Sequence, residues 1–116
     1  MNKMMISILG TAYELIIDNE IADSDVYGVC DRYAKTIRIN KNAFVGEGLT
    51  KNIQDVVKKT VRHELLHGIF HEMGLDCYAE DEVLIDALAI IYPKIENIMK
   101  QAEKNINVMI KKERIK

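Results

Sequence analysis

Two histidines and a glutamate stand together in the segment His63-Glu64-Leu65-Leu66-His67. On an α-helix, residues four apart share one face, with Cβ atoms about 5–6 Å apart. Two imidazoles at that spacing can bind one zinc ion at roughly 2.0–2.1 Å each. Glu64 would project near the open coordination position, where it could take a proton from water and pass it to a leaving amine. The motif therefore predicts metal-assisted hydrolysis, with His63 and His67 as ligands and Glu64 as general base.

A catalytic zinc site needs a third protein ligand, and the sequence favours Glu82. The segment 83–92 is apolar on every side except at Asp86, which predicts a buried helix. A lone buried carboxylate is costly unless it is hydrogen-bonded or paired. Glu82 and Asp86 lie four apart and so share a face. We expect Glu82 on the metal and Asp86 accepting a hydrogen bond from the far nitrogen of a ligand, with His63 preferred. The alternative places Glu82 as a solvated residue of the helix start and Asp86 against a water pocket.

Other side chains compete for the third position. His71 continues the series, but on a straight helix it stands about 12 Å from His63 along the axis, too far for one ion. We therefore expect His71 at the surface or outside the metal's own ligands. The remaining competitors are Asp76, Cys77, Glu80 and Asp81. For stabilising a developing oxyanion, no spacing selects one donor among Tyr27, Arg62, Tyr78 and Tyr92.

The surrounding elements follow from periodicity. Residues 4–9 and 12–17 flank Gly10-Thr11 as a hairpin, and 26–30 with 35–40 form a second hairpin. Residues 42–50 read as a connecting loop. Helical spacing begins near residue 51 and ends at Gly74. A helix over about 80–91 then ends at Pro93, which opens a final helix over about 94–111. The pattern predicts an α+β fold, with a small N-terminal antiparallel sheet followed by the active-site helix and C-terminal helices.

Composition limits the remaining possibilities. The chain of 116 residues fits a single domain over 1–116, and 48% hydrophobic with 29% charged residues is typical of globular proteins. A net charge of −2 gives no reason to expect nucleic acid as a partner. No segment approaches the 18 apolar residues of a membrane span. With no secretory signal and two cysteines lacking ligand spacing, we expect reduced thiols and a cytoplasmic location. The oligomeric state stays open.

The pattern His63-Glu64-x-x-His67 followed by Glu82-x-x-x-Asp86 resembles that of gluzincin metallopeptidases. The size, the hairpins and the ending Asp86 to Pro93 resemble small phage and mobile-element proteins related to the ImmA/IrrE metallopeptidases. This resemblance implies a zincin-like fold, a Zn²⁺ cofactor and a protein or peptide substrate, such as a repressor. It also implies that the strand before the active helix, here 35–40, aligns an extended peptide by backbone pairing.

The expected function is thus zinc-dependent hydrolysis of peptide bonds, with Glu64 as general base. The alternative is a catalytically inactive metal-binding module of regulatory or interaction type, of phage or mobile-element origin, because a metal site can exist without a working cleft. A third possibility is a helical adaptor whose histidines bind no metal. Two imidazoles and a carboxylate suit zinc better than manganese or iron.

Overall fold

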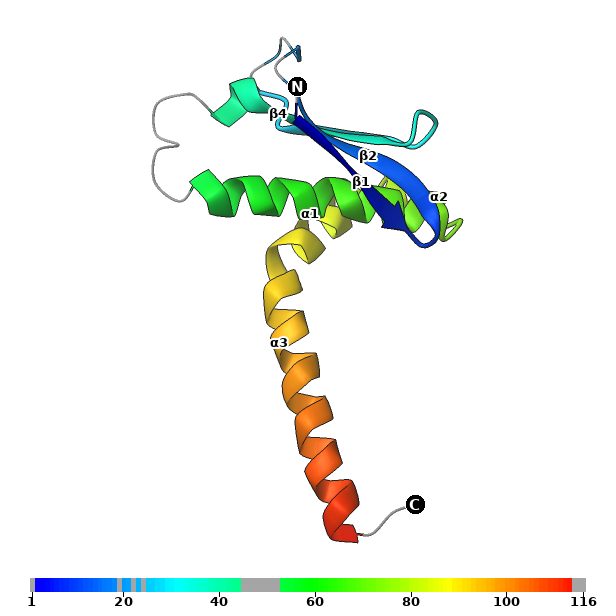
Figure 1. The fold of residues 1–116 in the computed structure, drawn as a ribbon, viewed down its shortest axis with the longest axis vertical. Coiled ribbons are helices and arrows are strands. Elements are labelled where there is room, and N and C mark those ends of the chain that lie inside the picture. The colour runs from blue at the N-terminus through cyan, green and yellow to red at the C-terminus, as the bar shows by residue number, and fades with distance from the viewer. Residues whose placement is uncertain (1, 19, 22, 24, 45–52, 114–116) are drawn as a thin grey trace.

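The computed structural model describes residues 2–18, 20–21, 23, 25–44 and 53–113. A four-stranded sheet covers one side of helix α1 (Ile53–Glu72), and the long helix α3 (Glu82–Glu113) leaves the domain on the other side (Figure 1). The short helix α2 (Asp76–Ala79) joins the two long helices. The model is therefore α+β, as the sequence predicted.

The sheet is built from two hairpins laid side by side. Strands β1 (Asn2–Ile8) and β2 (Thr11–Asp18) are antiparallel, as are β3 (Gly28–Asp31) and β4 (Thr36–Asn40). The turn between the first two strands is Leu9-Gly10, with φ of 50° and 90°. Positive φ at both central residues matches the right-handed twist of the flanking strands and favours glycine. Both hairpins are confirmed, although the first turn lies one residue earlier than expected.

The expectation of a purely antiparallel sheet is wrong. The strand order is β1-β2-β4-β3, and β2 pairs with β4 in parallel, Leu15 opposite Ile37. The sheet is therefore mixed, and β4 lies in its interior with neighbours on both sides. The segment predicted as a loop over 42–50 begins with a short 3-10 helix, Lys41–Phe44, and its residues 45–50 lie outside the described part of the chain.

Helix α1 packs against the sheet through apolar side chains at helical spacing. They meet a core that includes Tyr13, Ile37 and Ile39, each 2% exposed or less. The residues of α1 on this face are Val56, Val57, Val61, Leu65 and Ile69. A Cβ added at Gly68 would stand 3.1 Å from Cδ1 of Ile8. The missing side chain lets α1 approach the sheet closely, which fixes the helix that carries both histidines.

Helix α3 runs without interruption through Pro93, so the predicted break at that residue is wrong. Proline has no N–H, and in a helix it leaves the carbonyl four residues earlier without its donor. That carbonyl belongs to Ala89, and Nε of Arg62 donates to it at 2.7 Å. A side chain of α1 thus replaces the missing backbone donor, and the helix continues.

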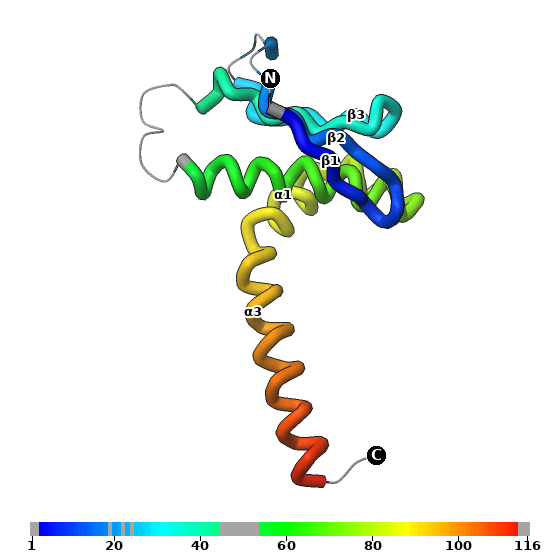
Figure 2. Tube along the Cα trace, viewed as in Figure 1, coloured from blue at the N-terminus to red at the C-terminus, as the bar shows by residue number. Residues whose placement is uncertain are grey.

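No helix in the described part of the chain has the length and apolar content needed to cross a membrane. Beyond its first turns, α3 extends away from the rest of the chain toward the C-terminus (Figure 2).

Candidate metal centre

Three predicted ligands meet where α1 faces the start of α3. Nε2 of His63 and Nε2 of His67 are 3.2 Å apart on adjacent turns of α1. Glu82, the first residue of α3, places Oε2 3.0 Å from Nε2 of His63 and Oε1 3.0 Å from Nε2 of His67. Within the described residues this is the one group of at least three His, Cys, Asp or Glu side chains with such convergent atoms.

The outer nitrogen of each histidine already has an acceptor. Nδ1 of His67 lies 2.6 Å from the carbonyl oxygen of Ala79, which can only accept, so Nδ1 carries the proton. Nδ1 of His63 faces a carboxylate oxygen of Asp86 at 3.4 Å. In the neutral rings, both Nε2 atoms therefore present lone pairs. Two lone pairs and a carboxylate directed at one point repel each other unless a cation stands between them.

The spacing of these atoms fits a zinc ion. Two ligand atoms at about 2.0–2.1 Å from one zinc and at a tetrahedral angle stand about 3.3–3.4 Å apart. The nitrogen–nitrogen distance of 3.2 Å is close to such an edge, and each nitrogen has a different oxygen of the Glu82 carboxylate 3.0 Å away. A single proton shared between two of these three acceptors would not relieve the electrostatic repulsion of the third. The donor set of two imidazoles and a carboxylate is also one that zinc prefers.

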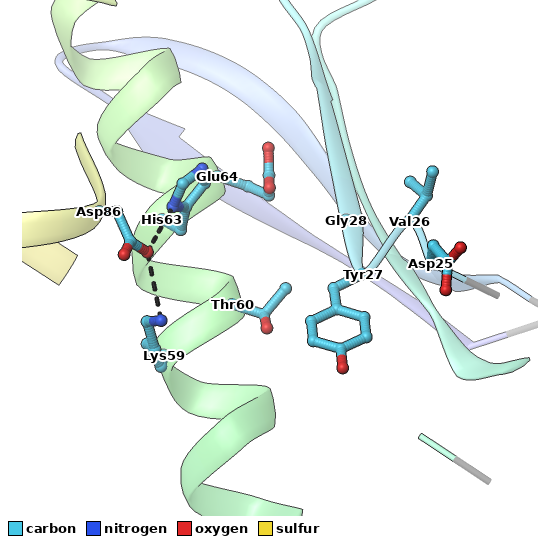
Figure 3. Close-up of a pocket in the computed structure, with 9 residues that line it drawn as sticks. All are labelled: Asp25, Val26, Tyr27, Gly28, Lys59, Thr60, His63, Glu64 and Asp86. Atoms are coloured by element: carbon cyan, nitrogen blue, oxygen red, sulfur yellow. Dashed lines mark ion pairs between the residues drawn. The ribbon is translucent and has the colours of Figure 1, made fainter. Parts of the chain in front are cut away.

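Asp86 lies behind His63, with a second partner that the sequence did not indicate. Its Oδ1 is 3.4 Å from Nδ1 of His63 and 3.2 Å from Nζ of Lys59, one turn earlier on α1 (Figure 3). A carboxylate in this position fixes the ring orientation and raises the basicity of the inner nitrogen. The prediction of a buried helix over 83–92 is wrong, since Val83 is 82% exposed and Ile90 56% exposed. Asp86 is itself half-exposed, and Lys59 balances its charge.

Glu64 stands beside the cluster and is shielded from solvent, at 7% exposure. Burial raises the pKa of its carboxyl group above the ordinary value, while the two adjacent histidines act in the opposite direction. The backbone N–H of Cys30 in β3 donates to its carboxylate. A Cβ on Gly28 would stand 2.9 Å from Cγ of Glu64, so only glycine lets β3 pass this close. No local pattern in the sequence singles out Gly28, because its role depends on a contact between distant elements.

Two adjoining pockets share Gly28 and Glu64. One, of about 320 Å³, lies between α1 and the residues leading into β3, with His63 and Glu64 on its helix wall (Figure 3). The other, of about 260 Å³, reaches from Cys30 past His67 to Glu82. An extended ligand lying along β3 would therefore pass both Glu64 and the cluster.

The remaining histidine forms a different arrangement, which we call the His71 cluster (His71, Asp76, Glu80). The His71 side chain is only 9% exposed and lies outside the convergent group, so of the two expected positions the surface one is wrong and the one outside the metal's own ligands agrees with the structure. Nδ1 is 3.0 Å from Oδ1 of Asp76, and Nε2 is 3.4 Å from Oε1 of Glu80. The two acids lie at opposite nitrogens, and Arg32 also contacts Asp76 at 3.1 Å. No common point receives three ligand atoms.

The candidate oxyanion donors do not gather at the cluster. Arg62 is engaged by the Ala89 carbonyl, Tyr78 packs near Phe70, and Tyr92 bonds to Glu96. Tyr27 lines the larger pocket, but its hydroxyl points away from Glu64 (Figure 3).

The strand implied by the resemblance as the peptide partner is also corrected. Strand β4 pairs with β2 and β3, so its backbone has no free edge. The edge strand beside the site is β3, which pairs only with β4 among the described strands. Both cysteines are free thiols. Cys30 lies in β3, where burial raises its pKa to about 11.

Neither a family model, nor a curated protein, nor a solved structure matches this chain. The assignment of a function therefore rests on the geometry of the His63–His67–Glu82 cluster and of Glu64 beside it.

Proposed function

We propose that the protein is a zinc-dependent peptidase that hydrolyses a peptide or protein chain lying along β3. The observation that carries the proposal is the convergence of Nε2 of His63, Nε2 of His67 and the carboxylate of Glu82, with both outer nitrogens already bonded. Three protein ligands leave one position of a tetrahedral ion open, which is the arrangement of a catalytic rather than a structural zinc site.

Zinc held there would polarise the scissile carbonyl and bring the pKa of water towards about 7. Glu64 is the base. Its carboxylate is buried beside both histidines and is fixed by the Cys30 N–H, so it is positioned to take a proton from water and to deliver it to the leaving nitrogen. A purely structural site has no use for this buried acid.

The substrate would add to the free edge of β3. An extended chain pairs with an edge strand through backbone hydrogen bonds, which give affinity without a fixed sequence. Gly28 has no side chain, which lets β3 lie against Glu64, and a substrate chain paired to the edge of β3 would therefore run close to the base. The two pockets on either side of Gly28 would receive alternate side chains.

A second candidate is a metal-binding module without catalysis. It is favoured by one observation, that Arg62, Tyr78 and Tyr92 are engaged elsewhere and the Tyr27 hydroxyl points away. In this case substrate-like chains would bind along β3 and remain intact.

The test compares zinc-loaded wild type with Glu64→Gln, which keeps all three ligands and removes only the base. Both are incubated with a mixed peptide library, and new termini are identified by mass spectrometry. We expect zinc in both proteins and cleavage by wild type at least about 100-fold faster. Equal cleavage would exclude Glu64 as base. Zinc in both proteins with no cleavage in either would favour the non-catalytic module.

A further inference from the structure

The second half of α3 carries no buried side chain. Ile85 and Ala89 are the buried residues of the helix, and from Ile90 to Glu113 each is exposed or half-buried. The helix leaves the domain as a single rod (Figures 1 and 2). The radius of gyration is 17.7 Å, against roughly 13 Å for a compact chain of this length. The rod is thus not folded back on its own domain.

An apolar stripe runs along this rod with alternating steps of four and three residues. Its members are Ile91, Ile95, Ile98, Ala102, Asn105 and Met109. Such spacing is that of the core positions in a helix packed against a second helix. Tyr92, Met99 and Ile106, one residue further on and seven apart, widen the stripe on one flank.

The stripe is exposed over most of its length. Ile98 is 61% exposed and Met109 56%, and the flanking Met99 is 58% exposed. In proteins, most of the stability of a helix comes from packing its amphipathic face against another element. An exposed apolar patch of this extent marks an interaction surface.

We propose that the stripe is a homodimer interface, in which the α3 rods of two copies pack antiparallel. The pattern is self-complementary when it is reversed about Lys100. Ile98 then stands beside Ala102 of the second copy, a large residue beside a small one, and Ile91 beside Met109, while Ile95 beside Asn105 is the one pair with a polar member. A self-complementary surface forms a dimer with twofold symmetry, which is the commonest form of oligomer.

The shape of the protein favours the antiparallel arrangement. The sheet and α1 lie across one end of α3 (Figure 1). Parallel rods would place two domains side by side at the same end, whereas antiparallel rods place them at opposite ends and leave both metal centres accessible. Antiparallel helices also oppose their macrodipoles favourably.

The size of the stripe suits a moderate dimer. It is about 27 Å long from Ile91 to Met109. Its side chains expose on the order of 600 Å² per chain, somewhat below the 800 Å² per partner of a standard interface. Asn105 interrupts the stripe and would face Ile95 of the second copy, which offers its amide no hydrogen bond, so this pair lowers the stability of the dimer. We therefore expect dissociation in the micromolar range.

A lipid surface is the other occupant of an amphipathic helix, and the polar face argues against it. Membrane-binding helices carry mostly Lys and Arg on that face. Here Lys100 and Lys104 alternate with Glu96 and Glu103, and Lys100 and Glu96 form an ion pair at 2.9 Å.

The test is the mass of the purified full-length protein by sedimentation equilibrium, from about 5 to about 500 µM. We expect wild type to pass from one chain to two, and Ile98→Asp to stay monomeric. The control is Asn97→Asp, which adds the same charge one residue away on the polar face and should dimerise like wild type. Asn105→Leu should dimerise more tightly. Circular dichroism shows whether each variant keeps its helix.

Orientation is tested with spin labels at Lys112→Cys in a Cys30→Ala, Cys77→Ser background. Antiparallel rods centred on Lys100 would hold the labels about 36 Å apart, and parallel rods much closer. Four results would overturn the proposal: a wild-type monomer at every concentration, a dimer that Ile98→Asp leaves intact, closely spaced labels, or a monomer whose α3 inserts into phosphatidylcholine–phosphatidylserine vesicles.

Discussion

The histidines of α1 meet acids from α2, the residue that follows it and α3 in two neighbouring sets, one with two histidines and one acid and the other with one histidine and two acids. In the His63–His67–Glu82 cluster, the inner nitrogens and the carboxylate are directed at one point, 3.0–3.2 Å from each other. In the His71 cluster, Asp76 and Glu80 contact opposite nitrogens of a single ring. The first set directs three acceptor atoms at one point, and the second is internally paired.

The two sets differ both in the number of imidazoles and in the direction of the ring nitrogens, and the direction decides whether three ligand atoms converge. The outer nitrogens of His63 and His67 are occupied by Asp86 and the Ala79 carbonyl, which turns both lone pairs inward. His71 has no such arrangement, because both its nitrogens are used by nearby acids. The proposed metal site is therefore the first set, and we expect the second to stabilise the end of α1.

The largest expected difference is between His67→Ala and His71→Ala. Removing His67 deletes a ligand, and we expect the zinc affinity to fall by more than about 100-fold, measured by competition with a chromophoric chelator. His71→Ala should leave the zinc affinity unchanged and lower the melting temperature of the zinc-free protein, because Asp76 and Glu80 lose their partner. An equal loss of zinc affinity in both variants would show that the two clusters do not differ in metal binding.

A smaller loss of zinc affinity is expected when a residue that contacts a ligand, and not the ligand itself, is removed. Asp86→Ala removes the acceptor behind His63, and outer-shell partners of this kind contribute about 10- to 100-fold in metal affinity. The matched change Asp76→Ala removes the corresponding acid behind His71 and should not alter zinc binding. If Asp86→Ala also leaves the zinc affinity unchanged, Asp86 serves to pair with Lys59 and does not orient His63 for metal binding.

The packing of α3 on α1 can be tested through Arg62. Arg62→Met leaves the Ala89 carbonyl without a donor, and an unsatisfied buried acceptor lowers the free energy of unfolding by about 1–3 kcal/mol. In Arg62→Met/Pro93→Ala the helix regains its own N–H donor, so much of this loss should be recovered in urea titrations. Lys58→Met, an exposed cation one turn earlier, is the control. If the double variant is no more stable than Arg62→Met alone, the unpaired Ala89 carbonyl is not the cause of the lost stability.

The smallest effect concerns acid stability at the far end of α1. Hydrogen bonds from Lys35 and Tyr13 lower the pKa of Glu72 from its ordinary 4.5 to about 2. A depressed pKa stabilises the fold above pH 4.5, and this contribution is lost as the pH falls towards 2. Glu72→Gln should flatten the melting temperature over that range, whereas Glu80→Gln, at an exposed acid, should not. Parallel curves for wild type and Glu72→Gln would contradict the assignment.

Local patterns in the sequence predicted much of this molecule. Helical spacing and the Gly74 stop predicted α1, and the i, i+4 pairs placed His63 with His67 and Glu82 with Asp86 on common faces. What failed depended on contacts between distant elements. The parallel pairing of β2 with β4 joins two hairpins that are separate in the sequence, and so no local pattern predicts it.

Pro93 shows the same limit. A proline usually ends a helix because it leaves one carbonyl without a donor, but here Arg62 of another helix donates to that carbonyl and the helix continues. Gly28 reads as an ordinary strand glycine until Glu64 is placed against it. The proposed peptide strand was assigned to β4 because it precedes α1 in sequence, while the free edge belongs to β3. In each case the missing information was which element lies next to which.

The most direct test of the metal centre is a crystal structure of the zinc-soaked protein with anomalous data on both sides of the zinc absorption edge. We predict one peak about 2.0–2.1 Å from Nε2 of His63, Nε2 of His67 and an oxygen of Glu82, with no peak at His71. A peak at the His71 cluster, or none at His63 and His67, would contradict the account.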